Sequence, residues 1–142
     1  MIFPFNGKFK KIISSNKDFD QIVGVINGAL FEERGKNQKP PVLDGNCLVF
    51  ANSFMTRSIF HAIQKGKFCI ILNGNDKILT YKFYMYYFFI IYILIGSFIA
   101  FLNKPIISKG YLALYIYLLL IWVASVISQK LFFNRIVKSL SQ

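Results

Sequence analysis

The sequence predicts an α+β fold: a small N-terminal domain, in which one amphipathic helix packs on an antiparallel sheet of about four strands, followed by a two-helix transmembrane hairpin. Two runs without any charged residue, 83–102 and 110–129, support the hairpin, because a helix of that length crosses ~30 Å of hydrocarbon. A stripe of apolar residues at helical spacing, followed by short apolar runs between turn residues, supports the domain. The composition, 55% hydrophobic and 16% charged, is more apolar than that of an average soluble domain.

Residues 1–82 form the predicted domain, which begins with one or two short strands broken at Asn6-Gly7. The residues 15–18 (SNKD) fit a capping box, with Ser15 as the N-cap of the helix. The apolar stripe continues to about Phe31, and Gly35 ends the helix. Gly24 and Gly28 each cost about 1 kcal/mol in a helix interior. They therefore predict close packing against the sheet, with a helix-dimer contact as the alternative.

The strands of the domain follow this helix. Residues 35–46 are expected to form a surface loop, because they contain Pro-Pro and Asp-Gly. The continuous apolar runs 47–51 and 68–72 predict interior strands covered on both faces. Residues 57–64 fit a strand or a helix, and a strand is favoured because Lys65-Gly66-Lys67 resembles a turn. The sequence NGND at 73–76 predicts a hairpin that leads into a last strand, 77–82.

The membrane segments are predicted at 83–102 and 110–129, joined by an external loop at 103–109 that contains Pro105. So short a loop makes the helices antiparallel, and both chain ends then lie on one side of the membrane. Basic residues near the helix ends are more frequent on the terminal side, which predicts cytoplasmic termini in a bacterial inner membrane, and reduced Cys47 and Cys69. The residues expected at this membrane surface are Lys77, Lys82, Lys130, Arg135 and Lys138.

Small residues in the two apolar runs mark the expected contact between the hairpin helices, because they let helix backbones approach closely. These residues are Gly96, Ala100, Ala113, Ala124 and Ser128. The chain after the second run, 130–142, is basic and has helical amphipathic spacing. It is expected either to cover the domain, which is favoured, or to lie among lipid headgroups.

The charge is strongly positive and uneven along the chain. The formal net charge is +11, and all six acidic residues lie at or before Asp76. We expect anionic lipid headgroups as a partner, and no nucleic acid, because Lys8, Lys10 and Lys11 are the only local basic cluster. The amino-acid drift of an AT-rich genome is an alternative origin of the lysines.

The sequence contains no catalytic, cofactor-binding or metal-ligating motif that we can identify. His61, Cys47 and Cys69 could form a nucleophilic pair or three zinc ligands, but buried cysteines usually behave as small apolar residues. Neither membrane run contains Asp, Glu, Lys, Arg or His, which removes the usual mark of an ion pathway. We therefore expect no enzyme, no cofactor and no metal.

The function expected from these features is that of a non-enzymatic inner-membrane protein whose cytoplasmic domain binds or positions a protein partner at the membrane surface. The alternative is an immunity-type protector whose hairpin binds a membrane-targeted toxin. The oligomeric state does not follow from the sequence.

Overall fold

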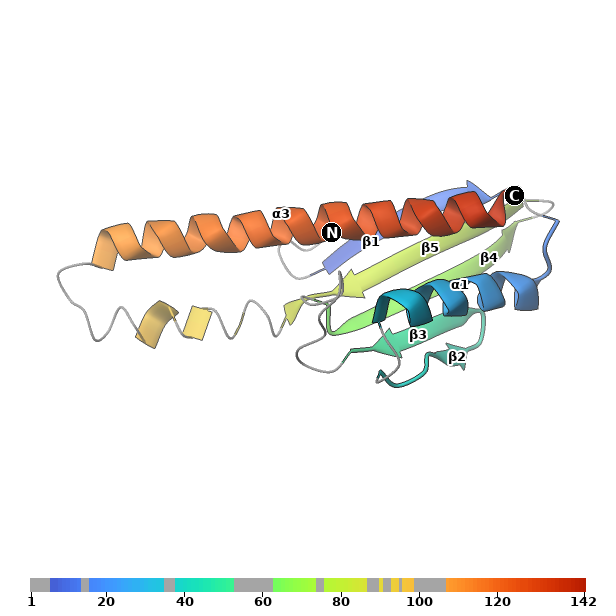
Figure 1. The fold of residues 1–142 in the computed structure, drawn as a ribbon, viewed down its shortest axis with the longest axis horizontal. Helices are drawn as coiled ribbons and strands as arrows, with labels where there is room; N and C mark the ends of the chain where they lie inside the picture. The colour runs from blue at the N-terminus through green and yellow to red at the C-terminus, as the bar shows by residue number, and fades with distance from the viewer. Residues whose placement is uncertain are drawn as a thin grey trace.

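A computed structural model of the chain describes residues 6–13, 16–34, 38–52, 63–73, 76–86, 90, 93–94, 96–98 and 107–142. The fold is α+β, as predicted, with a five-stranded antiparallel sheet in the order β1-β5-β4-β3-β2 (Figure 1). The elements are β1 (Asn6–Ile13), α1 (Phe19–Arg34), β2 (Val42–Asp44), β3 (Cys47–Ala51), β4 (Lys65–Asn73), β5 (Asp76–Tyr84) and α3 (Ile107–Leu140).

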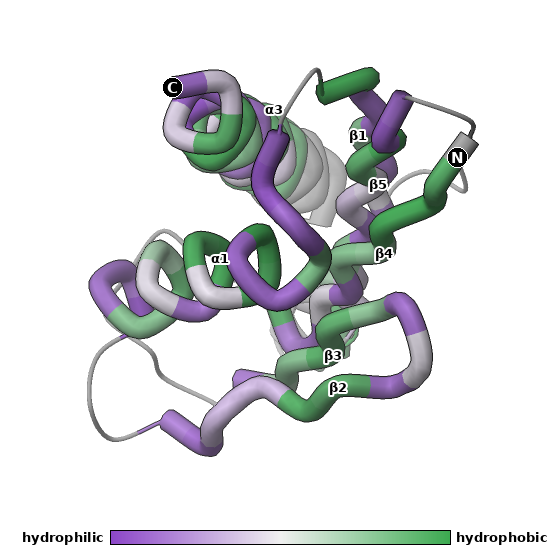
Figure 2. Tube along the Cα trace, turned by 90° about the vertical axis from the view of Figure 1, so that its right-hand side faces the viewer, coloured by the Kyte–Doolittle hydropathy of each residue, from purple (hydrophilic) through white to green (hydrophobic). Residues whose placement is uncertain are grey.

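The two helices lie beside each other on one face of the sheet (Figure 2). Between them and the strands is a single apolar core, which is rich in aromatic rings. The Tyr81 ring is fully buried at its centre and stacks on the Phe68 ring, with 4.2 Å between the ring centroids. Apolar burial of this kind is the main stabilising contribution to a small domain.

The fifth strand, β2, is a correction to the predicted loop at 35–46. It pairs with β3 through a two-residue turn, in which Gly45 has a φ of 55°. The two loop residues, Gly45 and Asn46, were therefore a hairpin signal, which the nearby prolines obscured. The strand predicted at 57–64 falls mostly outside the described residues, since only Ile63 and Gln64 are described and neither belongs to a strand.

The helix α1 begins later than predicted, because Asp18 and not Ser15 is its N-cap. The Gln21 backbone N–H donates to Asp18 Oδ1 (2.8 Å), and the Asp18 backbone N–H donates to Gln21 Oε1 (3.1 Å). This reciprocal pair satisfies two backbone donors at the helix start. The predicted apolar stripe is confirmed, with Ile22, Ile26 and Leu30 fully buried.

The glycines of α1 do not pack against the sheet, so that prediction was wrong. Gly24 and Gly28 are exposed, and a Cβ added to either one would meet no atom within 4 Å. The buried stripe leaves both on the opposite side of the helix.

Glycines inside the sheet explain two further corrections. Gly7 belongs to β1 and Gly66 to β4, although both had been read as chain breaks. A Cβ on Gly7 would overlap the ring of Phe83, and a Cβ on Gly66 would overlap the ring of Phe50. Each glycine is thus covered by the phenylalanine of the neighbouring strand, which replaces the missing side chain.

The helix α3 joins segments that had been predicted as separate. It runs through 34 residues, so the second membrane run and the tail 130–142 form one helix, which begins within the predicted loop 103–109. Its last part is buried against the sheet and α1 through Phe132, Phe133, Ile136, Val137 and Leu140.

The first membrane run begins later than residue 83, because β5 continues to Tyr84 and Phe83 is fully buried in the sheet. The described residues Tyr86, Ile90, 93–94 and 96–98 are helical. Ala100 and most of the predicted loop lie outside the described residues.

Candidate functional site

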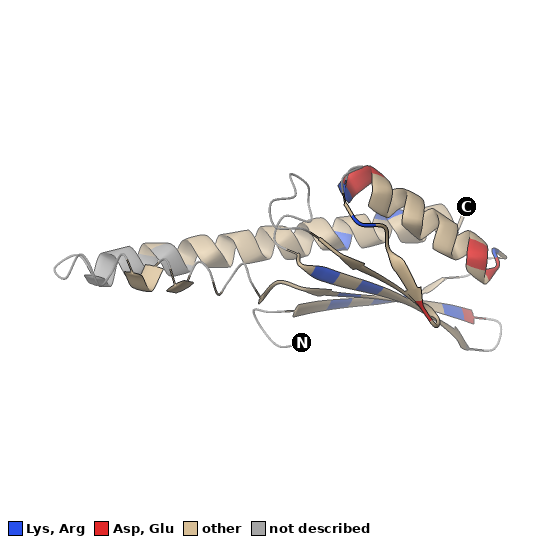
Figure 3. Ribbon diagram, turned by 90° about the horizontal axis from the view of Figure 1, so that it is seen from below, with Lys and Arg blue, Asp and Glu red and all other residues tan. Residues whose placement is uncertain are grey.

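The face of the sheet opposite the helices carries a concentration of lysines. Antiparallel register places residues that are directly opposite each other on the same face. No described element covers this face, and blue segments mark its lysines along the strands in Figure 3. We call it the lysine face, defined by Lys8, Lys10, Lys65, Lys67 and Lys82.

Three of these lysines form one continuous row across adjacent strands. Lys8 of β1 is opposite Lys82 of β5, and Lys82 is opposite Lys67 of β4. Lys67 forms an ion pair with Asp44 at 3.2 Å, but that carboxylate is 71% exposed, so its attraction is largely screened. Lys8 and Lys82 have no ion pair within the described part of the chain. Like charges directly opposite on a sheet are destabilising.

An apolar row lies on the same face, further from Tyr84. Ile12 is opposite Ile78, and Ile78 is opposite Ile71. Ile12 is 60% exposed and Ile71 is 52% exposed. We call these three residues the isoleucine row. Lys82 and Ile78 are four residues apart in β5, so the two rows are separated by about 13 Å along the strand.

Cys47 and Cys69 also lie on this face and form a disulfide. The two residues are directly opposite in the β3–β4 ladder, a relation that the sequence alone did not indicate because the register was unknown. This corrects the expectation of two free thiols. His61, the other member of the proposed nucleophilic or zinc cluster, lies outside the described residues.

A buried polar pair fastens α3 to the centre of the sheet. The Tyr81 hydroxyl donates to Gln129 Oε1 at 2.7 Å, and both residues are fully buried. Burial raises the pKa of Tyr81 well above its ordinary value, with the charge of Arg34 opposing the shift. The phenol therefore stays neutral and acts as a donor. Neither residue was singled out from the sequence, because a Gln at the end of an apolar run gives no sign of its partner.

Arg34 is a second buried polar group, at the end of α1. Its Nε donates to Asn52 Oδ1 at 2.6 Å, and its Nη2 donates to the carbonyls of Ala51 at 2.6 Å and Lys39 at 3.1 Å. The guanidinium lies 4.9 Å from the ring centroid of Phe50, within cation–π range. Burial lowers its pKa, with Tyr81 opposing the shift. These contacts fix the end of α1 to the end of β3.

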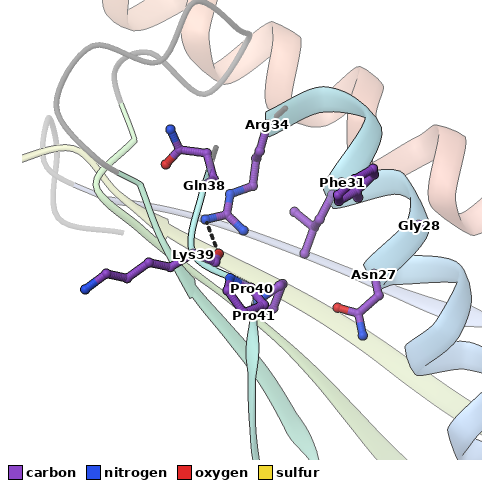
Figure 4. A pocket seen from close by; sticks show the side chains of 9 residues that line it. Asn27, Gly28, Phe31, Arg34, Gln38, Lys39, Pro40 and Pro41 are labelled. Atoms are coloured by element: carbon purple, nitrogen blue, oxygen red, sulfur yellow. Dashed lines mark hydrogen bonds between the residues drawn. The ribbon is translucent and has the colours of Figure 1, made fainter. Parts of the chain in front are cut away.

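A shallow open pocket of about 530 Å³ lies between α1 and the segment before β2 (Figure 4). Arg34 and the backbone of Lys39 close one end of it, and Phe31 and Pro40 contribute apolar walls. The Asn27 Oδ1 atom is buried without a hydrogen-bond partner. The pocket combines a cation, an amide and apolar surface, without a carboxylate or a thiol that could act on a substrate.

The basic residues predicted at the membrane surface are spread along the domain. Lys82 belongs to the lysine face, whereas Lys77 lies at the opposite end of β5, about 23 Å along the strand from Tyr84. Its Nζ donates to the carbonyl of Lys17. Lys130, Arg135 and Lys138 follow one another along α3 and are exposed, and Arg135 pairs with Glu33 of α1 at 2.6 Å.

The small residues predicted to pack the hairpin are described only in part. Gly96 is buried, Ala113 and Ala124 are exposed, Ser128 is partly buried, and Ala100 lies outside the described residues. The contact between the two membrane runs therefore stays a prediction.

One helix among the described residues, α3, is long and apolar enough to cross a membrane. Within 116–131 its exposed side chains are mostly large and apolar, including Leu120 and Leu131. They lie on one side of the helix, and the opposite side, which includes Trp122 and Gln129, packs toward the core. The described residues contain no group of three acids, histidines or cysteines that could hold a metal ion.

Comparison of the chain with protein-family models, with curated proteins and with solved structures finds no match.

Proposed function

We propose that this chain is a non-enzymatic protein of a bacterial inner membrane, whose domain binds and positions a protein partner beside the bilayer. The observation that carries the proposal is the continuity of α3. The same helix that is apolar enough to cross a membrane also supplies Phe132, Phe133 and Ile136 to the domain core. A domain built in this way has no flexible tether, so its open face keeps a fixed orientation to the membrane.

The hairpin is part of the proposal. Helical residues after Tyr84, among them exposed Ile93, Leu94 and Phe98, support a first membrane helix beside α3. With two antiparallel spans, the domain and the C-terminus lie on the same side. The docking of the end of α3 onto the domain is consistent with this arrangement.

The proposed side is the cytoplasm, because basic residues are in excess near the terminal ends of the membrane runs. The Cys47–Cys69 disulfide is the observation against it, since disulfides persist mainly in oxidising compartments. A cytoplasmic domain requires the pair to be reduced in living cells. Maleimide labelling of intact cells lysed in acid should then modify both cysteines without prior reduction. Labelling only after reduction would place the domain outside.

Binding of a protein is favoured because the open face offers charge and apolar surface together, and no described group of the domain is suited to chemistry on a bound molecule. The test is zero-length crosslinking of lysine amines to carboxylates in native membranes, followed by denaturing purification of the tagged full chain. The proposal expects a discrete adduct that contains a second protein. Only monomer, or only copies of this chain joined together, would contradict it.

A further inference from the structure

The lysine face is the largest feature of the domain that the fold itself does not explain. It carries five lysines, and the only acidic residues that share it by register are Asp44 and Asp76. Lys8, Lys82 and Lys67 stand side by side although their mutual repulsion disfavours the sheet. A positively charged surface that costs stability is expected where an anionic partner neutralises it.

The orientation of this face argues against lipid as the partner. β1 and β5 run alongside α3 (Figure 1), so the open face lies parallel to the axis of the helix proposed to cross the membrane. The face therefore points sideways along the bilayer and not into it. A second copy of the same face would bring five more lysines and only two acidic residues to the contact, which disfavours face-to-face pairing of two chains.

The isoleucine row distinguishes among the remaining anionic partners. Ile12 and Ile71 are more than half exposed, about 13 Å from the lysine row. A phosphate backbone offers nothing to cover these side chains. An acidic polypeptide can pair its carboxylates with the lysines and bury the isoleucines under apolar side chains.

We propose that the lysine face binds an acidic polypeptide segment of a partner protein, and that apolar residues of this segment cover the isoleucine row. The inference rests on the proposed function and names its surface and the chemistry of its partner. In an extended segment, the acidic and apolar residues would be about four positions apart. The orientation of the face places the partner beside the membrane-spanning part of this chain.

The test uses the full chain in a neutral detergent and a fluorescein-labelled peptide with four glutamates followed, four residues later, by two leucines. The variant K8Q/K67Q/K82Q removes the lysine row. The matched control K11Q/K39Q/K138Q removes three exposed lysines that lie outside this face. We expect at least tenfold weaker binding in the first variant and less than twofold in the control, measured by fluorescence anisotropy.

Several results would overturn the inference. Equal weakening in both variants would mean that only net charge matters. Undiminished binding of the same peptide with glutamine in place of glutamate would remove the role of the lysines. Tighter binding of a single-stranded oligonucleotide, or of vesicles with phosphatidylglycerol, would assign the face to nucleic acid or lipid. The variant I12S/I71S should weaken peptide binding about fivefold, and unchanged binding would contradict the role of the isoleucine row.

Thermal unfolding separates binding from folding in this test. K8Q/K67Q/K82Q should unfold at the same temperature as the native chain or higher, because it removes repulsion. If the native-membrane crosslink to a second protein persists while peptide binding is unaffected by the lysine variant, the proposed function stands and this surface is wrong. If neither a crosslinked protein nor peptide binding is found, both fail.

Discussion

The hydrogen bond between Tyr81 and Gln129 gives a quantitative test of the docking of α3 on the sheet. Tyr81→Phe removes the donor and leaves Gln129 Oε1 buried without it, and Gln129→Leu removes the acceptor of a fully buried hydroxyl. Removing one partner of a buried hydrogen bond costs about 1–3 kcal/mol, and removing the second partner does not cost the same bond again. The double variant should therefore lose less stability than the sum of the single variants, by about 1–3 kcal/mol.

The assay is reversible unfolding in mild detergent, monitored by the fluorescence of Trp122. This residue is the only tryptophan of the sequence and packs against the core. Each single variant should lower the unfolding temperature by roughly 4–12 °C, at about 4 °C per kcal/mol for a chain of this size. Tyr84→Phe is the control, because its hydroxyl has no hydrogen bond within the described part of the chain. Additive effects of the two single changes, within about 0.5 kcal/mol, would refute the coupling between α3 and β5.

Three further predictions concern the same core. The double variant Phe133→Ser/Val137→Ser should destabilise the protein by more than about 3 kcal/mol in thermal unfolding. Leu131→Ser, on the exposed side of α3, should not destabilise it to this extent. Equal effects would contradict the docking of α3. Gly7→Ala should destabilise the protein by about 1–3 kcal/mol, because the Phe83 ring occupies the position of the new methyl group. Gly24→Ala should stabilise it by up to about 1 kcal/mol. Chemical denaturation that ranked the two variants in the opposite order would disprove this packing. Burial raises the pKa of Tyr81 in the folded state, so the unfolded chain releases this proton first and the free energy of unfolding should fall as the pH rises above about 10. Tyr81→Phe should make that fall shallower by up to about 1.4 kcal/mol per pH unit. An unchanged slope would mean that Tyr81 is not buried.

The elements with strong local patterns were predictable from the sequence. The run 47–51 matches β3, and the predicted hairpin at 73–76 matches the pairing of Asn73 with Asp76. The α1 stripe was also visible, because helical periodicity is local. The first residue of α1 was not predictable, because Ser15 and Asp18 both fit a helix N-cap. Only the contact of Asp18 with Gln21 distinguishes them.

Features that depend on contacts between distant segments could not be predicted. Gly7 and Gly66 looked like breaks because the rings that cover them, Phe83 and Phe50, belong to other strands. The lysine face was hidden for the same reason. Lys67 and Lys82 belong to the two strands of the predicted hairpin, but Lys8 is far from both in the chain, and only the pairing of β1 with β5 brings it into the row.

The central claim, that a partner protein covers the open face of the sheet, is tested most directly by a photocrosslinker at one position on that face in native membranes. Ile12 is suitable, because it belongs to the isoleucine row, is 60% exposed, and can be replaced by benzoylphenylalanine while every lysine is kept. Phe31 on α1 is the matched control, with 58% exposure on the other side of the domain. After illumination, the account predicts a discrete protein adduct from position 12 and none from position 31. Equal adducts from both positions, or attachment of position 12 to lipid alone, would contradict it.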